Sequence, residues 1–161
     1  MVERPARTVK RAARIRAHPG SASYAAVVID PRIQEFLAGG PFAVVGASRD
    51  RAKYGNKVLR AYLQANKPVF CVHPRETEIE GQKCWPSLAA LPETPTGVSI
   101  ITPPSVTEQI VQEAHARGVR AVWMQPGAES PEAIATAERL GLDVIAGGPC
   151  VLVALRFREE G

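Results

Sequence analysis

The feature that most constrains the fold is a repeated alternation of short apolar runs with amphipathic helical segments. The runs lack the polar alternation of a half-exposed strand, so both faces of each strand are expected to be buried. Such strands, separated by helices, are typical of a parallel sheet that right-handed crossovers make doubly wound. We therefore predict an α/β fold, a Rossmann-like, doubly wound parallel five-stranded sheet with helices on both faces. The predicted strands are 42–45, 69–72, 98–101, 119–124 and 142–146.

The helical segments carry end signals of their own. Asp30 followed by Pro31 is typical of an N-cap, and Gly39-Gly40 predicts the end of that helix. Ser130 is predicted to cap another helix at its N-terminus. Further helices are predicted over 56–65, 106–117 and 131–140. The proline-rich segment 74–96 interrupts the pattern, and we expect a long connection with one short helix near 87–90.

Length and composition exclude several classes of protein. The chain has 161 residues, with 45% hydrophobic and 22% charged, which is ordinary for one soluble globular domain. No apolar stretch approaches the roughly 20 residues that span a bilayer, so no membrane partner is expected. Cys71, Cys84 and Cys150 form no Cys-x-x-Cys pair and follow no secretory signal. We therefore expect a cytoplasmic protein with neither a disulfide framework nor a metal site.

Residues 1–28 are predicted to be a basic, flexible extension of the domain 29–161. The first 18 residues have a net charge of +5 and the whole chain +4, so residues 19–161 sum to −1. Few large apolar residues are present to bury, which favours disorder or a solvated helix. An arm for nucleic acid or an anionic membrane, an organelle transit peptide and an unconserved or misassigned start all remain open.

Ligands of doubly wound sheets bind at the carboxyl ends of the strands, beside the first strand. There Gly46 allows a tight turn, Ser48 offers a hydroxyl group, and Gly55-Asn56 lies where a helix begins. Neither the dinucleotide motif G-x-G-x-x-G nor the P-loop motif is present. A phosphate site and a simple glycine turn with solvated cations both fit the pattern. The basic residues of this segment are Arg49, Arg51, Lys53 and Lys57.

The end of the second predicted strand distinguishes between ligands. NAD sites place an acid there, whereas this chain has His73, Pro74 and Arg75. Arginine suits a phosphorylated ribose, either the 2′-phosphate of NADP or the 3′-phosphate of coenzyme A. A solvated Arg75 and a structural His73 are the alternatives. The other strands end in Thr102-Pro103-Pro104, Gln125-Pro126-Gly127 and Gly147-Gly148-Pro149-Cys150, which can shape a groove.

Taken together, these motifs carry a family resemblance. They are Val45-Gly46-Ala47-Ser48, Lys53-Tyr54-Gly55-Asn56, Val72-His73-Pro74-Arg75, 81–88, Thr102-Pro103-Pro104, 122–127 and Pro149-Cys150. From about Gly40 to Leu155 the chain resembles the small CoA-binding proteins, which are similar to the CoA-binding domain of the succinyl-CoA synthetase α subunit. His73 replaces a usual asparagine, and the segment after Ala146 is unusually apolar.

The resemblance implies a site for coenzyme A or an acyl-CoA. It places Gly46 and Ser48 against the diphosphate, Lys53 near a phosphate, and Arg75 near the 3′-phosphate. Thr102, Pro103 and Pro104 would flank the adenine or pantetheine, and Gln125 and Gly127 would line the groove. The implied binding residues are Gly46, Ala47, Ser48, Lys53, Tyr54, Gly55, Asn56, His73, Arg75, Thr102, Pro103, Pro104, Gln125 and Gly127.

The resemblance also implies a binding domain without complete catalytic machinery. We predict no catalytic residue, because His73 has no evident acid–base partner and a nucleophile needs an activating base. A carrier, sensor or regulatory role is expected, with a protein partner possible.

An NADP-dependent oxidoreductase or a nucleotide-sugar protein is the alternative class, although Ser48 stands where a second glycine would favour a dinucleotide. Nucleic-acid binding through residues 1–18 is a third class. Cys150 is either a small buried hydrophobic residue or a thiol near the groove that forms a mixed disulfide with CoA.

Overall fold

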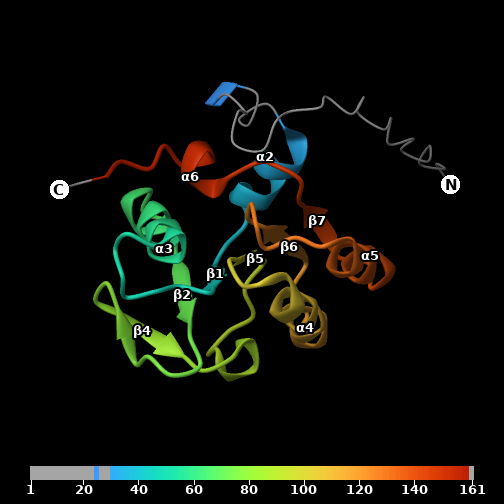
Figure 1. Cartoon of the computed structure of the whole chain (residues 1–161), viewed down its shortest axis with the longest axis horizontal. Helices are drawn as coiled ribbons and strands as arrows, with labels where there is room; N and C mark the ends of the chain where they lie inside the picture. Colours follow the sequence, from blue (N-terminus) through green and yellow to red (C-terminus); the bar gives the residue numbers. More distant parts are fainter. Residues whose placement is uncertain (1–23, 26–29, 160–161) are drawn as a thin grey trace, which may run out of the picture.

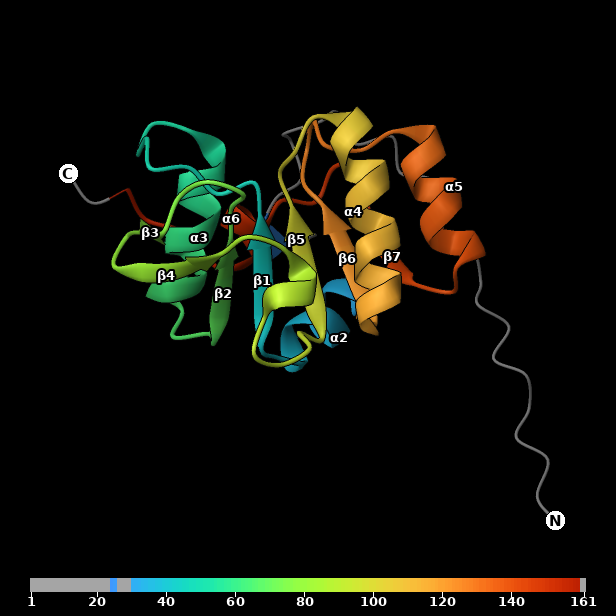
Figure 2. The same ribbon diagram turned by 90° about the horizontal axis from the view of Figure 1, so that it is seen from below.

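A computed structural model describes residues 24, 25 and 30–159, which form one seven-stranded sheet with helices against it (Figures 1 and 2). The predicted extension 1–28 lies outside these residues, apart from Tyr24 and Ala25. No helix in the described ranges is long and apolar enough to cross a membrane. The strands are β1 Phe42–Val45, β2 Val69–Val72, β3 Glu78–Ile79, β4 Gln82–Trp85, β5 Gly97–Ile100, β6 Ala121–Met124 and β7 Asp143–Ile145. The helices are α2 Pro31–Ala38, α3 Tyr54–Gln64, α4 Pro104–Arg117, α5 Pro131–Arg139, α6 Val151–Ala154 and the short 3-10 helix η1 Leu88–Ala90.

The order of the strands is β3-β4-β2-β1-β5-β6-β7, with β1 at the centre. Strand β1 pairs in parallel with β2 on one side and with β5 on the other. The chain moves outward from β1 through α3 to β2, and then from β5 through α4 and α5 to β7. This confirms the predicted α/β class and its doubly wound connections. The direction of winding reverses between β1 and β5, at the carboxyl edge where ligands of such sheets bind.

The predicted number of five strands is wrong. Within the segment interpreted as a connection, β4 pairs in parallel with β2, and β3 pairs antiparallel with β4. Both added strands are short and mostly polar, with only Ile79 and Cys84 well buried among their side chains. Glu80 and Gly81 turn the hairpin with φ angles of 51° and 73°. Such turns prefer Asn-Gly or Asp-Gly, so the Glu-Gly pair is a weak signal.

The core lies in two layers, one on each face of the sheet (Figure 2). Phe42 and Val44 of β1 pack in the layer that contains α2 and α3, and Ala43 and Val45 pack in the layer that contains α4 and α5. This alternation follows from the two-residue period of a strand, and burial of both sets explains why β1 is apolar throughout. The carboxyl ends of the strands are thereby held at fixed positions.

Two helices begin with the side-chain caps that the sequence predicts. Asp30 accepts a hydrogen bond from the Arg32 amide at 2.9 Å, and Ser130 accepts one from the Ala133 amide at 3.0 Å. Two other helices start two residues earlier than predicted. Helix α3 begins at Tyr54 and helix α4 begins at Pro104. Helix α6 was not predicted. Its four residues are too few for a periodic pattern to appear.

Two glycines allow the loop after β1 to lie directly against the backbone around it. A Cβ atom at Gly46 would overlap with the carbonyl oxygen of Ile101, just beyond β5, and Gly46 has a φ of 103°. A Cβ atom at Gly55 in α3 would overlap with the carbonyl oxygen of Gly46. Backbone atoms cannot move aside as a flexible side chain does. The turn 46–48, the end of β5 and the start of α3 are therefore fixed together.

We predict that Gly46→Ala lowers the free energy of unfolding by about 3–4 kcal/mol, because the added methyl group meets backbone and the left-handed φ disfavours alanine. Gly118→Ala is the matched control. Gly118 also has a positive φ, 87°, yet nothing lies within 4 Å of the position that its Cβ atom would take. The control should lose only about 1–2 kcal/mol. Urea unfolding measures both, and equal losses would contradict the close approach.

Candidate functional site

Two helix N-termini flank the point where the winding of the sheet reverses. Among the described helices of eight residues or more, α3 and α4 are the two that begin without a side-chain cap. They follow β1 and β5, which are neighbours in the sheet. At the start of α3 the first two amides, those of Tyr54 and Gly55, have no partner within the helix, whereas α4 begins with Pro103 and Pro104, which have no amide hydrogen. The helix dipole makes both ends positive. The starts of α3 and α4 thus both lie at the carboxyl edge, on opposite faces of the sheet and on either side of β1 and β5 (Figure 2).

The loop between β1 and α3 is held by the buried side chain of Asn56. Its amide nitrogen donates to the Ser48 carbonyl oxygen at 2.8 Å and to Glu80 Oε1 at 3.0 Å. Its oxygen accepts from Arg60 Nε at 2.7 Å. All three bonds are made inside the protein, and Asn56 is completely buried. Asn56 therefore positions the loop, whereas the resemblance implied contact with the ligand.

Arg60 extends this network to the end of the chain. Its guanidinium donates to the Arg51 carbonyl oxygen at 2.9 Å and to Glu159 at 3.2 Å. It also lies over the ring of Phe157, 5.1 Å from the centroid. The arginine is 4% exposed, and its Nη1 atom has no hydrogen-bond partner among the described residues. Residues 157–159 thus pack against α3.

Acidic side chains neutralise three of the five cations that the sequence places near the site. Arg49 pairs with Glu76 at 3.3 Å, and Arg51 pairs with Glu80 at 3.0 Å. The Lys57 ammonium lies 3.5 Å from Glu159. The remaining two, Lys53 and Arg75, are exposed and form no ion pair within the described ranges. They are the cations at this edge that remain available to an anionic ligand.

The end of β2 is shaped by the ring of His73. Its Nδ1 atom accepts hydrogen bonds from the backbone amides of Arg75 at 3.0 Å and Glu76 at 2.8 Å. The imidazole therefore folds the turn that carries Arg75. This geometry favours the structural interpretation of His73, with only Nε2 left for other contacts. The Arg49–Glu76 ion pair ties this turn to the loop after β1.

Tyr54, Gln125 and Cys150 come together from three separate elements. The Tyr54 hydroxyl donates to Gln125 Oε1 at 3.2 Å and also forms a short hydrogen bond with Cys150 Sγ. Burial, and then the contact with Cys150, raise the pKa of the Tyr54 hydroxyl, so it stays protonated. Gln125 Oε1 also accepts from the Val151 amide at 2.9 Å. Gln125 Nε2 is buried and has no partner in the described part of the chain.

The remaining predicted residues lie on the α4 and α5 side of the same edge. Thr102 is half-buried and its hydroxyl bonds to Thr107 Oγ1 at 2.8 Å, which orders the start of α4. Pro103 and Pro104 are exposed there. Gly127 has a φ of 92°, and its amide donates to Glu129 at 3.3 Å. The structure therefore brings the predicted residues to one edge, although Ala47 and Gly55 are buried there.

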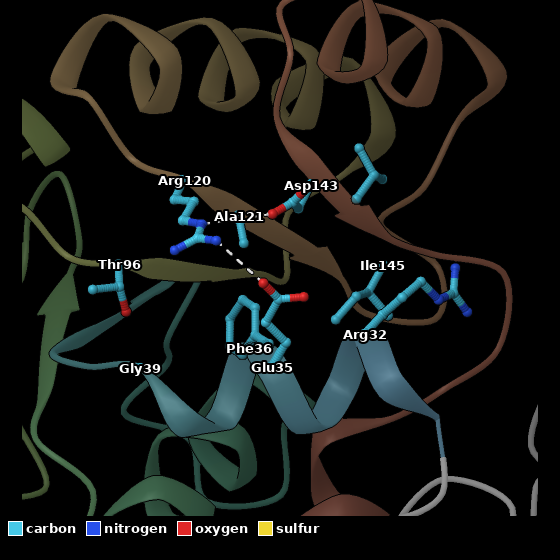
Figure 3. Close-up of a pocket in the computed structure, with 10 residues that line it drawn as sticks. Arg32, Glu35, Phe36, Gly39, Thr96, Arg120, Ala121, Asp143 and Ile145 are labelled. Atoms are coloured by element: carbon cyan, nitrogen blue, oxygen red, sulfur yellow. Dashed lines mark hydrogen bonds and ion pairs between the residues drawn. The ribbon is translucent and has the colours of Figure 1, made fainter. Parts of the chain in front are cut away.

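A cavity of about 210 Å³ lies at the opposite, amino end of the sheet, between α2 and strands β6 and β7 (Figure 3). Arg120 lines the cavity and pairs with Glu35 at 3.2 Å and with Asp143 at 3.8 Å. Arg32 is likewise paired with Asp30 at 2.8 Å. The charged groups of this cavity compensate one another. Its lining offers neither the uncapped helix ends nor the unpaired cations of the carboxyl edge.

Sequence reasoning missed the residues that organise the site from a distance. Glu80 lies in the unpredicted hairpin, yet it binds both Asn56 and Arg51. Arg60 was overlooked as an ordinary helix residue. The spacing of Asn56 and Arg60, four residues apart on one helix face, was the available signal. Nothing in the local sequence pointed to Glu159, because its partners lie far away along the chain.

Comparison with known proteins gives a consistent family match. The family described as CoA binding domain matches residues 41–156. A conserved hypothetical protein from Pyrococcus furiosus is 39% identical, with a TM-score of 0.66, over 70% of this chain and 96% of that one. A hypothetical protein from Pyrococcus horikoshii OT3 is 26% identical, with a TM-score of 0.73, over 88% of this chain and 96% of that one.

A curated relative is much longer than this chain. The ADP-forming acetate–CoA ligase I of Archaeoglobus fulgidus is 28% identical over 113 residues. The match covers 64% of this chain but only 16% of the ligase. The similarity therefore concerns one part of that enzyme.

We predict that Asn56→Ala lowers the free energy of unfolding by about 3 kcal/mol, because it leaves Arg60 Nε buried without its acceptor and releases the Ser48 carbonyl. Gln64→Ala is the control. Gln64 lies on the same helix and makes two hydrogen bonds, both to the Arg158 backbone, at 2.8 and 3.1 Å, but it is exposed. Its loss should be about 1 kcal/mol or less. Similar losses in chemical denaturation would remove Asn56 from its organising role.

Proposed function

The chain belongs to the CoA binding domain family, and on this premise we propose that it binds coenzyme A or an acyl-CoA at the carboxyl edge of its sheet. The observation that carries the proposal is the uncapped N-terminus of α3 beside the β1–β5 junction, where the winding of the sheet reverses. Helix N-termini bind phosphates through free amides and a favourable dipole. A diphosphate is the polyanion that this arrangement fits.

The diphosphate is assigned to the start of α3. Gly46, which lies directly against the Ile101 backbone, sets the path of the loop that leads to this position. Lys53 is the N-cap residue of α3, is exposed, and makes no side-chain capping bond. Its ammonium group can reach a phosphate at the helix end. Ser48 is half-buried, and its oxygen already accepts from the Asp50 amide, so the hydroxyl hydrogen is available to a ligand.

The phosphorylated ribose is assigned to Arg75. His73 fixes the turn through the Arg75 and Glu76 amides, which leaves the Arg75 side chain exposed at the end of β2. Its neighbour Arg49 is occupied by Glu76. An unpaired guanidinium binds a phosphate through two parallel hydrogen bonds. The 2′-phosphate of NADP offers the same chemistry, so NADP is the alternative ligand.

The less polar parts of the ligand are assigned to the start of α4. Pro103 and Pro104 are exposed there, and Val106 is one of the few large apolar side chains with a high exposure, 38%. Such a surface suits an adenine ring or a pantetheine arm. Gln125 lies at the same edge, but it is completely buried and its oxygen is held by Tyr54 and Val151, so we assign it to the wall beneath the ligand.

We infer a carrier, sensor or regulatory role in place of catalysis. The described site pairs no nucleophile with an activating base, since His73 Nδ1 is already committed to two amides. The similar ligase is an enzyme, but the match covers only 16% of it. The feature shared with that enzyme would then be recognition of CoA. A role of this kind requires a protein partner that receives the ligand or responds to it.

Thermal shift with a ligand panel tests the assignment. Coenzyme A should raise Tm, because a ligand that binds only the native state stabilises it by about 2.7 kcal/mol at a hundred times Kd. Dephospho-CoA should raise Tm less, since it lacks the 3′-phosphate. A shift with NADP and none with CoA, acetyl-CoA or longer acyl-CoAs would overturn the proposal in favour of a dinucleotide site.

Substitution of the proposed phosphate ligand gives a sharper result. Arg75→Ala should raise Kd for CoA about tenfold through the loss of a charge-assisted hydrogen bond, and leave Kd for dephospho-CoA almost unchanged. Arg139→Ala is the control, because Arg139 is exposed at the far end of α5. Calorimetric titration should give the control the wild-type Kd for both ligands. Equal weakening of CoA and dephospho-CoA by Arg75→Ala would place the 3′-phosphate elsewhere.

A further inference from the structure

Two cysteines face each other across neighbouring strands beside the hairpin. Cys71 of β2 and Cys84 of β4 are directly opposed in the parallel register. Their Sγ atoms are 2.9 Å apart, and both residues are free thiols. Sequence patterns offer no reason to join them, because twelve residues separate them and the strand that carries Cys84 was not predicted.

The backbone already holds the pair at a separation that a disulfide accepts. Neighbouring strands lie about 4.8 Å apart. Disulfides form between Cα atoms roughly 4.4–6.8 Å apart, with sulfurs about 2.05 Å from one another. Because the register is direct, both side chains project from the same face of the sheet, into the layer that contains α3. The sulfurs need to move together by less than about 1 Å.

We propose that Cys71 and Cys84 are a redox-active pair that forms a reversible disulfide between β2 and β4. The oxidant is a peroxide of the hydrogen peroxide class. One thiolate attacks the peroxide, the O–O bond breaks, and a sulfenic acid and water result. The second thiol then displaces the sulfenic oxygen as water and forms the S–S bond. Two thiols lose two electrons and two protons, and one peroxide becomes two waters.

The two thiols differ in their exposure to solvent, and this difference determines which of them meets the oxidant first. Cys84 is 7% exposed and Cys71 is 1% exposed, so a small oxidant reaches Cys84 first. Burial raises the pKa of both thiols. Thiolate is therefore scarce at neutral pH, and oxidation should be slow there and accelerate as the pH rises. Cys150 is half-buried and lies in a different part of the structure, beside Tyr54, where it serves as an internal comparison.

The disulfide would reinforce the support of the candidate site. The hairpin β3–β4 carries Glu80, which binds Asn56 of α3 and Arg51 of the loop after β1. In the reduced protein β4 is joined to the sheet by its short pairing with β2. A disulfide from Cys84 to Cys71 would join β4 covalently to β2, in addition to the contacts that Glu80 makes at the turn of the hairpin. Oxidation should then stabilise the folded chain without rearranging it.

Oxidation of the full chain followed by intact mass and peptide mapping tests the proposal. After limited treatment with hydrogen peroxide, the mass should fall by about 2 Da and the free thiols should fall from three to one. Mapping should join the peptides of Cys71 and Cys84. Melting temperature should rise by roughly 5–10 °C, and dithiothreitol should reverse both changes.

Matched variants separate this pair from the third cysteine. Cys150→Ser should retain the linkage, whereas Cys71→Ala and Cys84→Ala should each abolish it together with the rise in Tm. Peptide mapping of the wild-type chain decides the outcome even if a variant folds poorly. A linkage through Cys150, or oxidation of Cys150 with Cys71 and Cys84 still reduced after prolonged treatment at raised pH, would overturn the proposal.

Discussion

The contact on which the site depends is that of backbone against backbone at Gly46. There the turn after β1 lies against the carbonyl of Ile101 on one side and against Gly55 of α3 on the other. No residue larger than glycine fits at either position without displacing main chain. The contact fixes the start of α3 at the same edge of the sheet as the start of α4. It also requires the loop between β1 and α3 to follow a single path. The polar network of Asn56, Arg60 and Glu80 then holds that path.

The positive charge that the carboxyl edge offers to a ligand comes from the cations that remain unpaired. The chain has a net charge of +4, but Glu76, Glu80 and Glu159 neutralise the nearby cations Arg49, Arg51 and Lys57. What remains is local: Lys53, Arg75 and two helix dipoles. A compact polyanion is recognised by a few fixed positive groups at the correct spacing, and it does not need a strongly basic surface. The ion pairs have a second effect, because they join the loop after β1 to the turn after β2 and to the hairpin.

Elements with a strong period could be predicted from the sequence. Strand β1 and helices α2 and α5 follow from continuous apolar runs, from Asp30 and Ser130 as caps, and from glycines at helix ends. The hairpin β3–β4 was missed because its strands are short and polar and its Glu-Gly turn is unusual. The proposed site residues Ser48 and Arg75 were predicted from their place after a strand. The support given by Arg60 and Glu159 depends on contacts distant in sequence, which no local pattern encodes.

Binding of coenzyme A at the carboxyl edge, between the starts of α3 and α4, is the claim on which the proposed function rests. Amide chemical shifts of the ¹⁵N-labelled chain, followed during titration with CoA, locate the ligand residue by residue. We predict the largest changes at Gly46, Ser48 and Gly55, with further changes around Arg75 and Thr102. Changes gathered instead around Gly39, Thr96 and Arg120, which line the cavity at the amino end of the sheet, would contradict binding at the carboxyl edge.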